Sequence, residues 1–308
     1  MGKQYIEALK SRNVHFMVFS EYDAMQIMHY KFSYYTLIDY YPVFETYHAR
    51  KKSGLFIDLD FAQLYYLANI DLQLRKMVMA TCLDVEACLK SRLVFEIDSC
   101  CGGEFFFSQY YAKDRDYLDK VFSPEATDNM KNGQIKPIIE QISFYEFIKN
   151  AQFGTLERIA HAFYKDYAVV LYGSKYAPFE VHLSGIRKLR NIVAHNNSLL
   201  GSINQCQGWN DVKLLAILGK EGIGHRSLKR NMSRAVICNV CELLYEYNTL
   251  CGNAVSLKKT IEEFDKLYCR PYHDFFSKVD ALSSTYSFMK KAVPILLNED
   301  LTNRLNRI

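Results

Sequence analysis

Residues 71–97, which read DLQLRKMVMATCLDVEACLKSRLVFEI, decide the fold class of this chain. Apolar side chains recur in this stretch every three or four residues for about seven turns, which is the spacing of one face of an α-helix. The series is Leu74, Val78, Cys82, Val85, Leu89, Leu93 and Ile97. Helical spacing returns along most of the chain, whereas the alternating pattern of strands is rare. The sequence therefore predicts an all-α fold.

The composition is that of a folded, globular protein. Of the 308 residues 49% are hydrophobic, and there are 23 Tyr and 20 Phe, which excludes a disordered chain. No apolar run approaches the roughly 18 residues of a membrane span, and residues 1–7 lack the apolar region of a secretory signal. We expect a cytoplasmic protein without a membrane segment. Because no repeat or linker marks a boundary, we also expect one helical domain over residues 1–308.

Caps and breaks predict where the helices begin and end. In the first half of the chain, the aromatic stretch 30–47 predicts short helices, and a helix should begin near Phe61. Asp71 is interpreted as the N-cap of the long helix quoted above. The polar stretch 111–137 predicts a long connection, because it contains both Pro and Gly.

Further along the chain, a capping box at Ser143 predicts a helix that ends near Asn150. A helix over 156–171 should stop at Gly173, and Pro178 is the expected first residue of a helix that fades at Asn196 and Asn197. The glycines of 201–224 predict a loop region. Further helices are expected over about 233–247 and 255–268.

Basic charge is concentrated in one sixth of the chain. Residues 183–234 contain nine Arg and Lys against two acidic residues, so this window carries +7 while the whole chain carries +4. Such a window favours RNA or DNA as a partner, although a solvated basic face is the simpler explanation.

The sequence predicts no metal and no cofactor. It contains neither G-x-G-x-x-G nor G-x-x-x-x-G-K-[ST], and its histidines lack partners at metal-ligand spacing. Cys238 and Cys241 form a lone C-x-x-C, which we interpret as two small residues on a helix face.

Residues 190–195, RNIVAH, are the candidate catalytic motif within the basic window. Arg190 and His195 lie about 7.5 Å apart along a helix axis and about 140° apart around it, so the two side chains flank a groove. Asn191 lies one turn before His195 and could fix the tautomer of the imidazole. An imidazole can move a proton while a ribose 2′-hydroxyl attacks phosphate, and an arginine can stabilise the added charge. If a second copy of the helix lay across a dimer axis, one histidine could act as the acid and the other as the base. The alternative is that Arg190 covers the helix surface and His195 is a polar end residue.

Three segments resemble the Abi-like family, the AbiD/AbiF type of abortive infection proteins within the HEPN superfamily of helical ribonucleases. Residues 189–195 match its L-R-N-x-x-A-H signature, and 153–156 match its F-G-x-L turn. Residues 70–75, together with Glu86 and Lys90, match its D-x-x-L-R and I-E-x-x-x-K helix. The likeness runs from about residue 30 to about 205. It departs from the family after the histidine, where the family usually has a basic residue followed by leucine and this chain has Ser198, Leu199 and Leu200 after Asn196 and Asn197.

The resemblance implies a HEPN core over about residues 55–250 with helical extensions at both ends. It implies a metal-independent endoribonuclease of a phage-defence or toxin-antitoxin-like system, acting as a homodimer and held inactive by an RNA or protein partner. A non-catalytic RNA-binding module is the alternative. Carried over by position, the catalytic residues are Arg190, His195 and Asn191. The RNA contacts expected beside them are Arg187, Lys188, Asn196 and Asn197, and the expected supporting residues are Arg75 and Glu86. Residues 206–308 lie outside the resemblance.

Overall fold

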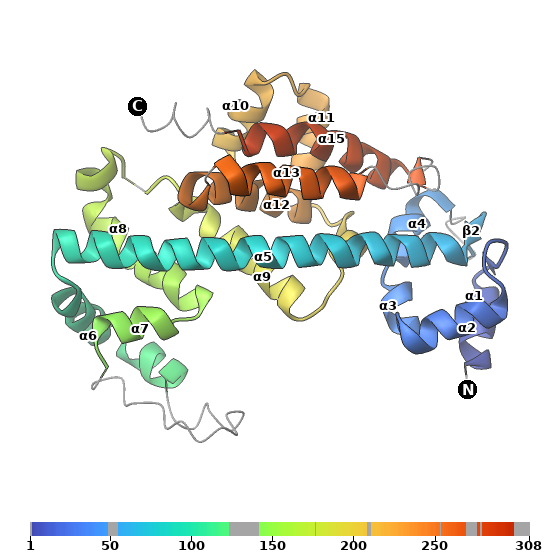
Figure 1. The fold of residues 1–308 in the computed structure, drawn as a ribbon, viewed down its shortest axis with the longest axis horizontal. Helices are drawn as coiled ribbons and strands as arrows, with labels where there is room; N and C mark the ends of the chain where they lie inside the picture. The colour runs from blue at the N-terminus through green and yellow to red at the C-terminus, as the bar shows by residue number, and fades with distance from the viewer. Residues whose placement is uncertain are drawn as a thin grey trace. The chain divides into compact units, whose positions relative to one another are not determined.

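The structure, a computed structural model, describes residues 2–48, 55–122, 142–175, 177–207, 211–252, 254–268, 276–277 and 279–298. These residues form an all-α fold, so the predicted fold class is confirmed (Figure 1). The strands named among them are β1 (Val14–His15) and β2 (Leu59–Asp60), which pair in parallel over two residues. The element that dominates is α5 (Phe61–Cys100), a helix of 40 residues.

The chain divides into two compact units, one made of residues 1–83 and 188–308 and the other of residues 84–187. Both boundaries fall inside helices, because α5 and α9 (Leu183–Ala194) each continue from one unit into the other. This explains why the sequence shows no linker at either boundary. That residues 1–308 make one domain stays a prediction.

The first unit contains four N-terminal helices before α5 and a C-terminal bundle after α9. The N-terminal helices are α1 (Lys3–Ser11), α2 (Glu21–Tyr30), α3 (Tyr34–Ile38) and α4 (Tyr41–His48). After α9 follow the 3-10 turn η4 (Leu200–Ser202), α10 (Val212–Lys220), α11 (His225–Met232), α12 (Ala235–Glu246), the π-helix η5 (Tyr247–Cys251), α13 (Ala254–Tyr268) and α15 (Asp280–Leu296). In the bundle, α15 packs against α11, α12 and α13 (Figure 1).

The second unit packs α6 (Gly103–Phe122), α7 (Phe144–Asn150), α8 (Phe153–Tyr172) and the 3-10 turn η3 (Glu180–His182) around aromatic rings. The rings of Phe144 and Phe163 both meet Phe106 edge to face. Gly103 is required at the start of α6, because a Cβ there would lie 2.2 Å from the ring of Phe144.

Several predicted boundaries are confirmed. The capping box at Ser143 is complete, since its hydroxyl accepts the Glu146 amide and the Glu146 carboxylate accepts the Ser143 amide. Helix α8 stops at Gly173, whose φ is 61°. The short helices expected over 30–47 and the helices near 233–247 and 255–268 are present.

Four predictions are wrong. Asp71 is no N-cap, because α5 runs through it without interruption. Residues 111–122 belong to α6, which buries Leu118 despite its polar sequence, while 123–137 lie outside the described residues. Much of the supposed loop region 201–224 is helical, since η4 and α10 fall within it.

Pro178 is also misplaced, because it lies in a turn before η3 and α9 begins only at Leu183.

Candidate functional site

The predicted motif lies at the C-terminal end of α9, where the chain makes a Schellman turn. The amide of Asn196 donates to the Val193 carbonyl (3.1 Å), and the amide of Asn197 donates to the Ile192 carbonyl (3.0 Å). Asn196, where the sequence predicts that the helix fades, has φ 59° and is in the left-handed conformation, which Asn tolerates. His195 is therefore the C-cap residue of α9, and its side chain is exposed.

Asp71, in the middle of α5, fixes the segment that follows this turn. Its carboxylate is fully buried, and Oδ1 accepts the backbone amides of Leu199 (3.0 Å) and Leu200 (2.7 Å). Oδ2 accepts the hydroxyl of Tyr40 (2.9 Å). Asp71 thus satisfies two amides that are 128 and 129 residues away in the sequence.

Arg75, one turn after Asp71 on α5, holds the turn itself. Its Nη1 donates to the backbone carbonyl of Asn196 (2.8 Å) and also to the side-chain oxygen of Asn196. Its Nε lies 3.0 Å from Oδ2 of Asp71, as an ion pair rather than an aligned hydrogen bond. Arg75 therefore binds the first residue of the segment 196–200, and Asp71 binds its last two residues. We call these two residues of α5 the clamp.

Burial dominates the electrostatics of this clamp. Desolvation raises the pKa of Asp71 above its usual value, against the lowering effects of the Leu200 amide and Arg75. Desolvation and the neighbouring Asp71 carboxylate raise the pKa of Tyr40, so this phenol stays a neutral donor at physiological pH. A buried carboxylate that is surrounded by one cation and three donors is costly to expose or to leave unpaired.

Arg190, on α9, is the cation of the candidate motif. No ion pair between Arg190 and a carboxylate is found among the described residues, and its buried Nε has no hydrogen-bond partner there. The side chain is half-buried on α9, five residues before the exposed His195. A cation that has no carboxylate partner among the described residues, and an exposed imidazole five residues later, would suit an anionic substrate.

Asn191 contacts His195 through the backbone, because its carbonyl accepts the His195 amide (3.1 Å). That its side chain fixes the imidazole tautomer stays a prediction. Among the expected RNA contacts, Lys188, Asn196 and Asn197 are exposed. Arg187 differs from them, because its Nε donates to Glu157 (2.5 Å), which neutralises its charge.

Glu86 forms a separate ion pair with Lys90 (3.2 Å), whose Nζ also donates to the Lys149 carbonyl (3.0 Å). One carboxylate oxygen of Glu86, Oε2, is buried and has no partner among the described residues. Arg75 and Glu86, which the sequence placed together as supporting residues, thus belong to different ion pairs on α5.

Sequence reasoning missed the roles of Asp71 and Tyr40. A signal for Asp71 was present, because it lies four residues before Arg75 and on the stripe that continues through Val78 and Cys82. Leu74, the first residue of the apolar series predicted from the sequence, is only half-buried. Arg75 occupies the buried position in its place.

No group of three or more His, Cys, Asp or Glu that could hold a metal ion occurs in the part of the chain that the structure describes. Cys238 and Cys241 are buried on α12, as the interpretation of two helix-face residues requires. Burial raises the pKa of both thiols, which keeps them neutral.

The comparison with protein families identifies the family of this chain. The family model described as Abi-like protein matches residues 29–201, which is more than half of the chain. The chain belongs to the Abi-like family. The Abi-like match includes Tyr40, Asp71, Arg75 and the whole of the motif turn, and it ends just after the amides that Asp71 binds.

The Abi-like match leaves α10 to α15 uncovered. Searches of curated proteins and of solved structures gave no match. Within the described part of this Abi-like chain, no helix has both the length and the apolar character needed to cross a bilayer.

Proposed function

We propose that this Abi-like protein is a metal-independent endoribonuclease of the HEPN type that acts in abortive infection. The observation that carries the proposal is the Arg190 guanidinium on α9, which has no carboxylate partner among the described residues and lies five residues before an exposed His195 on a turn that Asp71 and Arg75 hold in place. An enzyme that moves protons at a phosphate needs a positioned imidazole and a cation without a competing carboxylate.

In the proposed reaction, a ribose 2′-hydroxyl attacks the adjacent phosphorus and the bond to the 5′-oxygen of the next nucleotide breaks. His195 takes the 2′-hydroxyl proton or gives a proton to the leaving oxygen, and Arg190 stabilises the added negative charge on the phosphoryl oxygens. The products are a 2′,3′-cyclic phosphate and a 5′-hydroxyl end. A second copy of the chain would supply the other proton-transfer group, so the active form is a homodimer.

Arg75 and Asp71 act in this proposal as positioning residues. They touch the backbone around His195 and not the imidazole itself, so they would set where the imidazole lies. Lys188, Asn196 and Asn197 are exposed beside the motif and would contact the RNA backbone, whereas Arg187 is already paired with Glu157. The partner that silences the enzyme before infection would be an RNA or a protein.

The test is incubation of the purified chain with a mixed RNA pool in EDTA, followed by analysis of the product ends. We expect cleavage with 2′,3′-cyclic phosphate ends, which His195→Ala abolishes. The matched control is His15→Ala, which removes another exposed histidine outside the family match. Tight RNA binding without products, unchanged by His195→Ala, would instead favour a non-catalytic RNA-binding module. Cleavage that only a divalent ion supports would overturn the metal-independent mechanism.

A further inference from the structure

The segment from α10 to the start of α12 presents a second basic surface, outside the residues that match the family. Residues 212–234 contain six Arg and Lys and one acidic residue, and α11 contributes three of these cations within eight residues. Arg226, Lys229 and Arg230 are spaced i, i+3, i+4, so they lie on one face of α11, and all three are exposed. The opposite face buries Leu228, Asn231 and Met232.

The position of α11 is fixed by the turn that precedes it. Gly222 has φ 91° and ends α10, and the amide of Ile223 donates back to the Leu218 carbonyl (3.1 Å). Ile223 is buried after this reversal, while Lys220 and Gly224 on either side of it are exposed. Helices α10 and α11 thus form a short helical hairpin whose second helix is the basic one.

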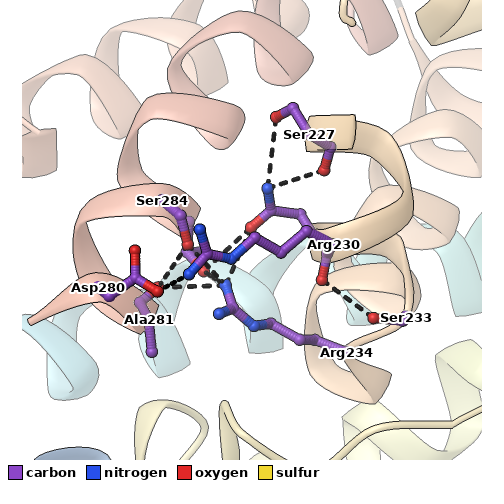
Figure 2. Close-up of polar contacts among 9 residues, drawn as sticks. Ser227, Arg230, Ser233, Arg234, Asp280, Ala281 and Ser284 are labelled. Carbon is purple, nitrogen blue, oxygen red and sulfur yellow. Dashed lines mark hydrogen bonds and ion pairs between the residues drawn. The ribbon is translucent and has the colours of Figure 1, made fainter. Parts of the chain in front are cut away.

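A buried arginine anchors α11 to α15. Figure 2 shows Arg234, just after α11, reaching toward the first turns of α15, where its Nη1 donates to Ala281 O (3.2 Å) and Ser284 Oγ (3.1 Å). The same nitrogen donates to Thr285 Oγ1 (2.7 Å) and to Asn231 Oδ1 (3.0 Å). Because its described partners are all neutral, Arg234 leaves the positive charge of this region intact.

Of the three cations on α11, one forms an ion pair among the described residues. Figure 2 also shows Arg230 paired with Asp280 at the start of α15. No ion pair of Arg226 or Lys229 is found among the described residues. The hairpin therefore presents exposed cations on a helix that is anchored to α15, and their charge complements a polyanion.

This surface is connected to the motif turn within the same unit. The segment that follows η4 pairs with the end of α11, because the amide of Gln207 donates to Ser233 O (2.8 Å) and the amide of Ala235 donates to Gln205 O (3.0 Å). Backbone hydrogen bonds therefore join the segment after the motif turn to the residues at the end of the basic helix.

We propose that α11, with Lys220 at the preceding turn, is a phosphate-binding surface that holds RNA by its backbone, apart from the residues of the cleavage motif. The choice of RNA rests on the proposed function; the binding surface itself rests on charge, exposure and anchoring. Contacts of this kind give affinity without sequence preference and depend steeply on salt.

The test measures RNA binding by the full chain carrying His195→Ala, so that no probe is cut during the measurement. The probes are a labelled single-stranded RNA, a labelled RNA hairpin and a DNA hairpin of the same sequence. The test variant adds Arg226→Ala and Lys229→Ala, which change only exposed side chains. The matched control adds Lys290→Ala and Lys291→Ala, two exposed cations further along α15.

We expect the Arg226/Lys229 variant to bind RNA about 5 to 30 times more weakly at physiological salt. The slope of log K against log salt should fall by about 1.4 to 1.8, as the loss of two phosphate contacts requires. Equal affinity of the variant and its parent, or an equal loss in the Lys290/Lys291 control, would overturn the proposal. An equal loss for DNA, with DNA bound as tightly as RNA, would overturn the choice of RNA.

The two RNA probes distinguish whether α11 binds the substrate RNA or a regulatory RNA. A loss of affinity for a single strand that the wild-type chain cleaves assigns α11 to the substrate. A loss confined to a hairpin that the wild-type chain leaves intact assigns α11 to a regulatory RNA. Because binding is measured in the His195→Ala background, an absence of ribonuclease activity in the wild type would leave this result standing.

Discussion

Replacing Arg75 by Met should destabilise the first unit strongly, and the cost follows from the contacts of Asp71. The substitution keeps much of the side-chain volume but removes the cation beside a fully buried carboxylate and both hydrogen bonds to Asn196. Breaking a buried pair by removing one partner costs about 3 to 5 kcal/mol. Because Asp71 keeps Tyr40 and two backbone donors, we expect the lower end, about 3 kcal/mol, or more than a hundredfold in the unfolding equilibrium.

A second substitution isolates the electrostatic part of this cost. Both backbone amides bind Oδ1 of Asp71, whereas Arg75 faces Oδ2. Asp71→Asn therefore keeps the acceptor for Leu199 and Leu200 while removing the charge. In the Arg75→Met background, Asp71→Asn should restore about 1 to 2 kcal/mol of the free energy of unfolding. In the wild-type chain, Asp71→Asn should be destabilising, because the new amide group faces Arg75.

The assay is urea-induced unfolding followed by circular dichroism, together with hydrogen exchange at the amides of Leu199 and Leu200. Arg75→Met should speed exchange at both amides. Lys76→Met is the matched control, because it removes an exposed neighbouring cation and should change stability by less than about 0.5 kcal/mol. If Arg75→Met costs under about 1 kcal/mol, or if Asp71→Asn recovers nothing in its background, the reasoning about the clamp is wrong.

Three further predictions concern local features of the fold. Asn196→Ala should destabilise the chain by about 1 to 2 kcal/mol more than Asn196→Gly in thermal unfolding, because only Gly adopts the positive φ without strain. Equal losses would mean that the side-chain contact with Arg75 matters and the backbone conformation does not. Gly103→Ala should lower the urea midpoint of the second unit, at a cost of about 1 to 3 kcal/mol, since its Cβ would overlap the ring of Phe144; an unchanged midpoint would contradict the tight packing at α6. Ser143→Ala should cost about 0.5 to 2 kcal/mol and speed amide exchange in the first turn of α7, whereas unaltered exchange would argue against the capping box.

Features with a local cause were predictable from the sequence. The capping box at Ser143 and the end of α9 at Asn196 depend only on residues within one or two turns, so the pattern contains the whole signal. The position of the motif at the end of a helix was predictable for the same reason, and the structure adds the Schellman hydrogen bonds.

Features that depend on distant partners were not predictable. Asp71 has the residue type of a cap and does bind two free amides, but those amides belong to Leu199 and Leu200 instead of its own helix. The glycines of 201–224 suggested a loop because of their number, yet Gly222 and Gly224 stand at helix ends and α10 lies between the breaks. The predicted roles of Arg190, Asn191 and His195 in catalysis await the cleavage assay.

The long separation between Asp71 and its two amides has a consequence for biosynthesis. A ribosome that adds about 5 to 20 residues per second needs roughly 6 to 26 seconds to travel from Asp71 to Leu199, and the whole second unit is synthesised during that interval. Until then the α5 carboxylate has no turn to hold, so a nascent or truncated chain that ends before residue 199 cannot order the motif. The arrangement delays completion of the site until nearly two thirds of the polypeptide has been made.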